Sequence, residues 1–426
     1  MPDPRCAVSA LRADWVFPGD QAPIRDGVVA WKDSRLLYVG SDRGEFPATD
    51  AGHVAIVPGL VNAHTHLEFS HRATPVGRPG MPFPDWIFEL VQERRAEAEL
   101  PADKNQPDRI AESIQQGLVE CLQAGVTSVG EIARQPCHAN AAGPEPEMTV
   151  FQELIGLADE PAEAAYQTAA AFLAQSAAHP ARQFGLSPHA PYTVRLDLLQ
   201  RCVELAEQAG VPVAMHLAES PEELELLASA GGPFVQRLEA LGAWAPGAIP
   251  RGLRPRDYLE ILARAPRTLV IHGNFLLPDE FELLARHAET MSVVYCPRTH
   301  AYFGYGRYPL AEMLAAGVQV VFGTDSRATA PDLSLLAEMR WVARHHPEIE
   351  PAHVLRLGTL AAARALGRAR LTGSLQPGKR ADLAVVSLPE TDFSDPYEAL
   401  WTADTPVRAT ICQGLLRRPR APSGTT

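Results

Sequence analysis

The chain contains very little lysine. Among its 426 residues only Lys32, Lys104 and Lys379 are lysine, so arginine supplies most of the positive charge. The formal net charge is −13, and basic residues do not form clusters. Because proteins bind a nucleic-acid backbone through clustered Lys and Arg side chains, we do not expect this chain to bind nucleic acid.

Other common sequence features are missing as well. There is no uninterrupted apolar run of about 18 residues, so no membrane-spanning helix is expected. Residues 1–8 do not show a basic segment followed by an apolar stretch, which argues against a secretory signal. The cysteines, at positions 6, 121, 137, 202, 296 and 412, form no Cys-x-x-Cys pair. Scattered cysteines are typical of a reducing compartment, and we predict a cytoplasmic protein.

The centre of the chain alternates short apolar runs with longer helical patterns, which predicts an α/β fold with a parallel sheet. Eight strand-helix units over this length suit a closed (β/α)8 TIM-type barrel. The predicted strands cover residues 55–66, 127–131, 148–156, 183–187, 211–216, 268–272, 292–296 and 318–323. The predicted helices cover residues 107–124, 161–178, 195–209, 221–241, 279–287, 309–315, 333–345 and 352–366.

Both flanks of this region have the alternating apolar residues and turns of β-structure, at residues 28–39, 373–386 and 409–416. The simplest arrangement is a small β-sandwich domain assembled from residues 1–55 and 368–420. The barrel would then be a catalytic domain of residues 56–367. The alternative is two unrelated β-flaps, one at each end.

The most informative stretch is a pair of histidines, His64 and His66, directly after the apolar run 54–61. In an extended strand, residues i and i+2 point to the same face. The two imidazoles would therefore converge at one strand end, and a bound metal ion is the best reason for such a pair.

Further polar residues stand at the carboxyl ends of later predicted strands: His189, His216, Glu219, His272 and Asp325. One such residue is usually a solvated loop residue. Five of them at the ends that form the active face of a TIM-type barrel indicate a shared site.

His64, His66, His216 and Asp325 would provide three nitrogens and one oxygen, which suits one divalent metal with room for water. Zinc is our first choice, and iron and manganese remain open. Such a metal lowers the pKa of a bound water to about 7. Glu219, three residues after His216, is the predicted general acid and base. His272 and Asp325 are predicted to orient the water, and Asp325 to take up a proton later in the reaction.

At these motifs the chain resembles the amidohydrolase superfamily, and within it the branch that deaminates nucleobases and nucleosides. The similar segments include Pro58 to His66, Ser187 to Tyr192, His216 to Glu219, Gly323 to Ser326 and Gly373 to Asp382. The resemblance implies a metal-bearing barrel with a β-sandwich built from both termini. Binuclear relatives bridge two metals with a lysine on the fourth strand, and this chain has no lysine there, which favours one metal. Some relatives use glutamate instead, so Glu153 is either such a ligand or a polar residue of the barrel interior.

Several residues are candidates for contacts with a small-molecule substrate. By the resemblance, His189 contacts the substrate; otherwise it is a loop histidine bonded to backbone. Trp86, in the aromatic segment 80–88, either stacks on a base or belongs to the apolar face of the next helix. Glu68 either reaches the substrate or pairs with an arginine. Ser326, beside Asp325, is a further predicted contact.

Arg298, in the segment Cys296 to Phe303, is predicted to bind an anionic group, since guanidinium suits a carboxylate. The alternative is an ion pair with Asp332 or Glu338. The segment resembles that of aminodeoxyfutalosine deaminases of the menaquinone pathway, whose substrate carries a benzoate.

We therefore expect hydrolytic deamination of an adenine nucleoside, with 6-amino-6-deoxyfutalosine as the best guess. Adenosine, methylthioadenosine and S-adenosylhomocysteine are the alternative substrates of the same reaction. A different reaction on the same scaffold, hydrolysis of a cyclic amide or triazine C–N bond, stays open, as does a barrel that only binds. The resemblance also suggests a homo-oligomer.

Overall fold

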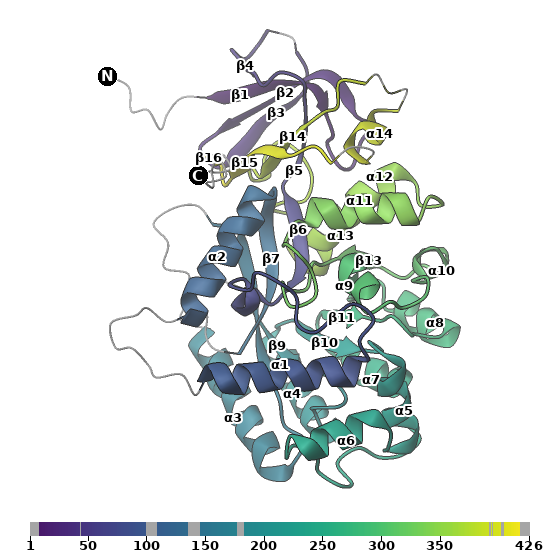
Figure 1. Cartoon of the computed structure of the whole chain (residues 1–426). Coiled ribbons are helices and arrows are strands. Elements are labelled where there is room, and N and C mark those ends of the chain that lie inside the picture. Colours follow the sequence, from purple (N-terminus) through teal and green to yellow (C-terminus); the bar gives the residue numbers. More distant parts are fainter. Residues whose placement is uncertain are drawn as a thin grey trace.

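The structure is a computed structural model that describes residues 8–42, 44–98, 109–134, 145–176, 183–391, 393, 395–401 and 404–417. Figure 1 shows two stacked parts, a barrel surrounded by helices and a separate sheet that contains segments from both chain ends. The predicted α/β class, with a TIM-type barrel beside a small β-structure, is confirmed.

The barrel is an eight-stranded parallel sheet whose strands follow the order of the sequence. It consists of β6 (Leu60–Thr65), β7 (Val126–Ala133), β8 (Glu147–Leu154), β9 (Gln183–Pro188), β10 (Val213–Leu217), β11 (Thr268–His272), β12 (Met291–Tyr295) and β13 (Val320–Phe322). Most of these strands are buried along their whole length, because helices cover the outer face of a parallel sheet.

The first and last strands meet at one point. The backbone amides of Thr324 and Asp325 both donate to the carbonyl oxygen of His64, each at 3.2 Å. The His66 amide donates in turn to the carbonyl of Asp325 at 3.3 Å. Barrel closure therefore brings together residues 64–66, at the end of the first barrel strand, and residues 324–325, which follow the last one.

The helices around the barrel are α1 (Phe83–Ala98), α2 (Arg109–Gln123), α3 (Asp159–Ser176), α4 (Leu196–Ala209), α5 (Pro221–Ser229), α6 (Pro233–Ala240), α7 (Pro255–Leu262), α8 (Pro278–Arg286), α9 (Pro297–Tyr302), α10 (Leu310–Ala315), α11 (Leu335–His345), α12 (Pro351–Leu357) and α13 (Leu360–Ala365). A short 3-10 helix, η2 (Leu67–Phe69), follows β6. Among the described residues, no helix has both the length and the apolar character needed to cross a membrane.

The second sheet joins the two chain ends (Figure 1). It contains β1 (Ser9–Val16), β2 (Ile24–Lys32), β3 (Arg35–Ser41), β4 (Thr49–Asp50) and β5 (Val54–Pro58) from the N-terminal part. From the C-terminal part it contains β14 (Leu383–Ser387), β15 (Val407–Cys412) and β16 (Leu415–Arg417), with α14 (Pro396–Trp401) between them. Antiparallel pairing of β14 with β5 joins the two halves. The exact domain boundaries at residues 55/56 and 367/368 stay a prediction.

The single strand predicted over residues 55–66 is wrong, because the segment forms β5 and β6 in different sheets. The change occurs at Gly59, whose amide donates to the carbonyl of Asp382 at 2.8 Å, while the next amide, of Leu60, donates to Gly125 at 2.9 Å. A Cβ atom at Gly59 would lie 2.2 Å from Thr127 Oγ1. Glycine is thus required where the chain leaves one sheet for the other.

Two of the predicted helices are each split in two. Residues 221–241 form α5 and α6, because Ala230 and Gly232 adopt φ of 50° and 89° and end the first helix. Residues 352–366 form α12 and α13, and the break at Gly358 frees its carbonyl to accept from Val61 of β6 at 2.9 Å. The aromatic segment 80–88, in turn, runs into a long helix, α1, that had no counterpart among the predicted helices.

Candidate metal centre and active site

His64 and His66 lie at the end of β6, and their rings meet at the mouth of the barrel. His64 is fully buried, and neither of its ring nitrogens has a hydrogen-bond partner among the described residues. Burial lowers the pKa of His64 to about 3. Its imidazole is therefore neutral at physiological pH, which is the form that binds a metal.

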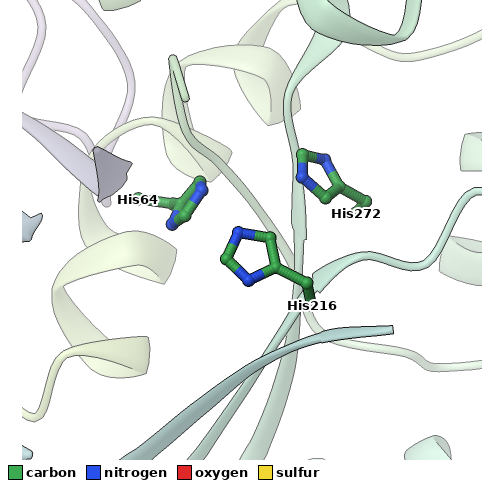
Figure 2. A group of neighbouring side chains, drawn as sticks. All are labelled: His64, His216 and His272. Atoms are coloured by element: carbon green, nitrogen blue, oxygen red, sulfur yellow. The ribbon is translucent and has the colours of Figure 1, made fainter. Parts of the chain in front are cut away.

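His216, near the end of β10, points toward His64 and lies beside His272 (Figure 2). Its Nδ1 lies 3.1 Å from the carbonyl oxygen of His189, so the proton sits on Nδ1 and Nε2 keeps its lone pair. That Nε2 lies 3.3 Å from Nε2 of His66. Two nitrogens at about 2.0–2.1 Å from a tetrahedral metal are separated by about the same distance.

Asp325 and His272 enter the site from two further strand ends. Asp325 Oδ1 lies 3.6 Å from His64 Nε2 and 4.0 Å from His66 Nε2. His64, His216 and His272 also form a group in which one ring nitrogen from each lies close enough to the others for one ion. Asp325 and His272 both have positive φ, of 57° and 67°. Non-glycine residues in this conformation carry backbone strain, which is characteristic of functional sites.

The donor set fits a divalent transition metal. It is rich in neutral imidazole nitrogen, contains one carboxylate, and leaves both nitrogens of a buried histidine unpaired. The structure thus brings together all four predicted ligands, His64, His66, His216 and Asp325, and adds His272 at their edge. Their assignment as ligands stays a prediction.

Glu219 stands beside this cluster, with its Oε1 atom 3.2 Å from Nε2 of His272. Burial and the nearby charges of Asp325 and Glu223 raise its pKa well above the ordinary value. Its backbone is held on both sides: its amide donates to Glu223 at 3.0 Å, and its carbonyl accepts from Asn274 Nδ2 at 2.9 Å. The predicted acid-base residue is therefore buried, held by hydrogen bonds to its backbone, and next to His272, which was predicted to orient the water.

Glu131, which was not predicted from the sequence, supports the segment that carries the two histidines of β6. Glu131 is fully buried at the end of β7, and burial raises its pKa well above the ordinary value. Its carboxylate accepts from Thr65 Oγ1 at 2.5 Å and from the amide of Leu67 at 2.9 Å. It thereby fixes the residues on either side of His66. Its place at the end of a predicted strand was the available signal.

An inner cavity of about 50 Å³ opens onto the cluster, and three of the predicted substrate contacts line it: His189, Trp86 and Ser326. His189 bonds through Nδ1 to Thr193 Oγ1 at 2.7 Å. Trp86 lies on α1, where its indole nitrogen donates to the carbonyl of Val76 at 3.1 Å. It is therefore both part of the apolar face of a helix and a wall of the cavity.

Glu153 also lines the inner cavity, and its side chain is 5% exposed. Its Oε2 atom has no hydrogen-bond partner among the described residues and lies 3.7 Å from Arg134 Nε. Arg94, on α1, lines the same cavity and pairs with Glu68. Glu68 faces a neighbouring space rather than the inner cavity, so it has taken the arginine-pairing role that the sequence left open.

The prediction that Arg298 binds a substrate anion is not supported by its position. Its Nε bonds to Glu338 Oε1 at 2.5 Å and its Nη2 to Asp332 Oδ1 at 2.8 Å. Glu338 is fully buried, so it requires this counter-charge. Within the described part of the chain, Arg298 is also not among the residues that line the inner cavity. The structural ion pair, which was the alternative, is what the fold contains.

The chain is similar to known proteins over most of its length. Residues 55–416 match the amidohydrolase family. The 5-methylthioadenosine/S-adenosylhomocysteine deaminase of Moorella thermoacetica is 30% identical over 402 residues, which cover 90% of this chain and 86% of the relative. The aminodeoxyfutalosine deaminase of Deinococcus radiodurans is 28% identical over 340 residues, covering 76% and 77%. A crystal structure of an adenosine deaminase from Xanthomonas campestris with bound zinc superposes with a TM-score of 0.74 at 25% identity, covering 97% and 93%.

Proposed function

The chain belongs to the amidohydrolase family, and we propose that it is a metal-dependent deaminase that releases ammonia from an adenine nucleoside. The observation that carries this proposal is the contact of Glu219 with His272, 3.2 Å apart, beside the convergent histidines and Asp325. The printed names of relatives that align over most of the chain, an adenosylhomocysteine-type deaminase among them, support the nucleoside class.

The proposed chemistry needs one group that both gives and takes protons. A divalent metal held by His64, His66, His216 and Asp325 would supply a water activated for attack. Burial raises the pKa of Glu219, which favours its protonated form, and the protonated carboxyl can donate to the ring nitrogen beside the amino-bearing carbon. The resulting carboxylate would then take the proton from the oxygen that has added to the carbon and pass it to the amino group, which leaves as ammonia while the C=O bond forms. His272 holds Glu219 in place through Nε2.

The remaining predicted residues would bind the nucleoside around this centre. His189, Trp86 and Ser326 line the inner cavity and are proposed to contact the base. The phenyl ring of Phe83 and the phenol of Tyr192, which stack against neighbours at the same wall, add an apolar surface for a planar ring.

We propose zinc as the metal, supported by the zinc-containing structure from Xanthomonas campestris, with iron or manganese as alternatives. 6-Amino-6-deoxyfutalosine is the first substrate to test, supported by the relative from Deinococcus radiodurans. Methylthioadenosine and S-adenosylhomocysteine have equal support from the relative of Moorella thermoacetica. A cytoplasmic location and homo-oligomerisation stay predictions.

The test is ammonia release, followed with the ultraviolet change from adenine to hypoxanthine, by zinc-loaded protein. The panel holds 6-amino-6-deoxyfutalosine, adenosine, methylthioadenosine, S-adenosylhomocysteine, guanine and cytosine. Turnover of one or more adenine nucleosides supports the proposal. Turnover of guanine or cytosine alone, or no turnover by protein with one metal bound, contradicts it.

A further inference from the structure

The barrel face opposite the metal-binding cluster contains two adjoining cavities, here called the basal cavities. The first measures about 670 Å³ and the second about 620 Å³. The second lies where β11, β12 and β13 begin, because Arg267, Ser292 and Gln319 line it. The first lies beside it, between α12, α13 and residues 374–379, which precede β14. The metal-binding cluster, in contrast, lies at the carboxyl ends of the barrel strands.

Positive charge is concentrated in the basal cavities. Among the described residues that line them, Asp20 and Glu289 are the only carboxylates, against five cationic side chains. These five are Arg267, Arg356, Arg364, Arg370 and Lys379. The whole chain has a formal net charge of −13 and only three lysines. A local excess of positive charge in such a chain favours an anionic ligand at this place.

Three of these arginines have no carboxylate partner. In the part of the chain that the structure describes, the side chains of Arg356, Arg364 and Arg370 are exposed and form no ion pair or hydrogen bond. Arg368, from the same segment, pairs instead with Glu147 at 2.9 Å. A guanidinium has five N–H donors, so the three unpaired side chains keep all of theirs for a ligand. Arg364 and Arg370 line both basal cavities, so one ligand could contact them from either space.

Lys379 is held at the wall of the first basal cavity. Its Nζ donates to Ser374 Oγ at 2.8 Å and lies 3.5 Å from the carbonyl oxygen of Thr372. Burial lowers the pKa of Lys379, and the positive charge of Arg364 also lowers it, whereas Asp20 raises it. Two like charges therefore repel each other across this cavity, and a bound anion would offset the repulsion.

The size and the charge of the basal cavities favour a small ligand with several negative charges. Small-molecule sites typically measure about 300–1,000 Å³, and a membrane surface or a nucleic-acid duplex cannot enter a concave space of this size. Guanidinium groups bind phosphate oxygens through two parallel hydrogen bonds, and lysine binds phosphate as a point charge. A chain of phosphate groups carries several such charges within the length of one small molecule.

We propose that the basal cavities form one binding site for a chain of at least two phosphate groups, held by Arg364, Arg370 and Lys379. Inorganic triphosphate and the triphosphate of a nucleotide share this chemistry. The site is separate from the metal-binding cluster, and it does not depend on the deaminase function proposed above.

The test is isothermal titration calorimetry of the zinc-loaded protein with inorganic triphosphate. We expect one triphosphate per chain, bound with an affinity that falls as the salt concentration rises. In Arg364→Gln/Arg370→Gln the dissociation constant should rise about 100-fold, because two charge-assisted interactions are lost. Arg364→Lys/Arg370→Lys keeps both charges but loses the paired donors, so the rise should be smaller. Both variants should keep the wild-type Tm, because these side chains bond to no other described residue.

Arg78→Gln/Arg251→Gln is the matched control. It removes the same charge from two exposed arginines that line neither basal cavity, so triphosphate should bind it as tightly as wild type. Because triphosphate also chelates zinc, elemental analysis after each titration checks that the proteins compared carry equal zinc.

ATP and citrate complete the test. Binding of ATP at least as tight as that of triphosphate supports the site with a nucleotide as its ligand, and weaker binding of ATP supports it with a free phosphate chain. Equal triphosphate affinities in Arg364→Gln/Arg370→Gln and in the control would overturn the proposal. So would the absence of triphosphate binding to wild type at low salt, or tighter binding of citrate, a tricarboxylate, than of triphosphate.

Discussion

The carboxylate of Glu131 accepts a hydrogen bond of 2.5 Å from the hydroxyl of Thr65, the residue between the two histidines of β6. Thr65 also pairs with Asp325, which follows the last strand of the barrel, where the barrel closes. One buried carboxylate on β7 therefore connects three of the four predicted metal ligands through a single residue.

Replacing Glu131 with Gln should weaken metal binding without touching a ligand. Both oxygens of the Glu131 carboxylate accept hydrogen bonds, whereas a glutamine side chain has a single accepting oxygen. Glutamine therefore cannot hold both Thr65 and the backbone N–H of Leu67, and the segment carrying His66 should loosen. Loss of such supporting residues typically costs about 10–100-fold in metal affinity. Competition with a chromogenic zinc chelator measures this, and Glu160→Gln on the exposed start of α3 is the control. Unchanged zinc affinity would exclude the supporting role.

Glu219→Gln should retain one metal per chain and lose turnover by about 10²–10⁴-fold, the usual contribution of an acid-base group. The amide keeps the size of the side chain but cannot transfer protons. Metal content by elemental analysis, together with steady-state kinetics, separates the two effects. Glu225→Gln, an exposed residue on α5, is the matched control. Substantial activity in Glu219→Gln would remove this residue from the mechanism.

We expect one divalent metal per chain and increased thermal stability when it is bound. A ligand at 100 times its dissociation constant stabilises the folded state by about 2.7 kcal/mol. Chelation should lower Tm and zinc should restore it. In His64→Asn both effects should disappear, while exposed His345→Asn should behave as wild type. Two metals per chain, or zinc-dependent stabilisation of His64→Asn, would contradict the site.

Arg298→Met should destabilise the protein and affect all substrates alike. It leaves Glu338, which is fully buried, without its counter-charge, and breaking such a pair costs about 3–5 kcal/mol. Arg344→Met, which breaks a largely exposed pair with Asp404, should cost about 1 kcal/mol or less. Thermal unfolding and the nucleoside panel provide the readouts. A stable variant with a selective loss of the carboxylate-bearing substrate would restore the sequence-based prediction for Arg298.

The raised pKa of Glu223 predicts how the free energy of unfolding depends on pH. Burial raises its pKa from 4.5 to about 7, although the amides of Ala218 and Glu219 donate to it. The folded state therefore binds more protons than the unfolded state between these two values, and stability from this group falls as pH rises through that window. The free energy of unfolding of wild type minus that of Glu223→Gln, measured by urea unfolding, should be more positive at pH 5 than at pH 8. A more positive difference at pH 8 would show that folding lowers this pKa.

Much of the site could be predicted because the fold forces its members together. A parallel barrel places the carboxyl ends of all its strands on one face. A histidine or carboxylate at the end of an apolar run can therefore be placed on that face from the sequence alone. This holds for His64, His216, His272 and Asp325, and the predicted strands match β7 to β13 closely.

The errors arise where the decisive contact comes from a distant part of the chain. Arg298 follows a strand end just as the histidines do, but Glu338, forty residues later, turns its guanidinium away from the cavity. Arg94 carries no local signal, since it is one of two successive arginines near the end of a helix. The break at Gly59 depends on the side chain of Thr127.

The sequence by itself determined the barrel, the sheet built from both ends and the convergence of a metal-binding set, because apolar periodicity and strand order decide which residues share a face. Only the tertiary structure decided which charged side chains line the inner cavity. A guanidinium or carboxylate turns toward whichever partner the packed helices bring within reach. In this chain Arg94 pairs with Glu68 and lines the inner cavity, whereas Arg298 pairs with Glu338 and Asp332 and is not among the lining residues.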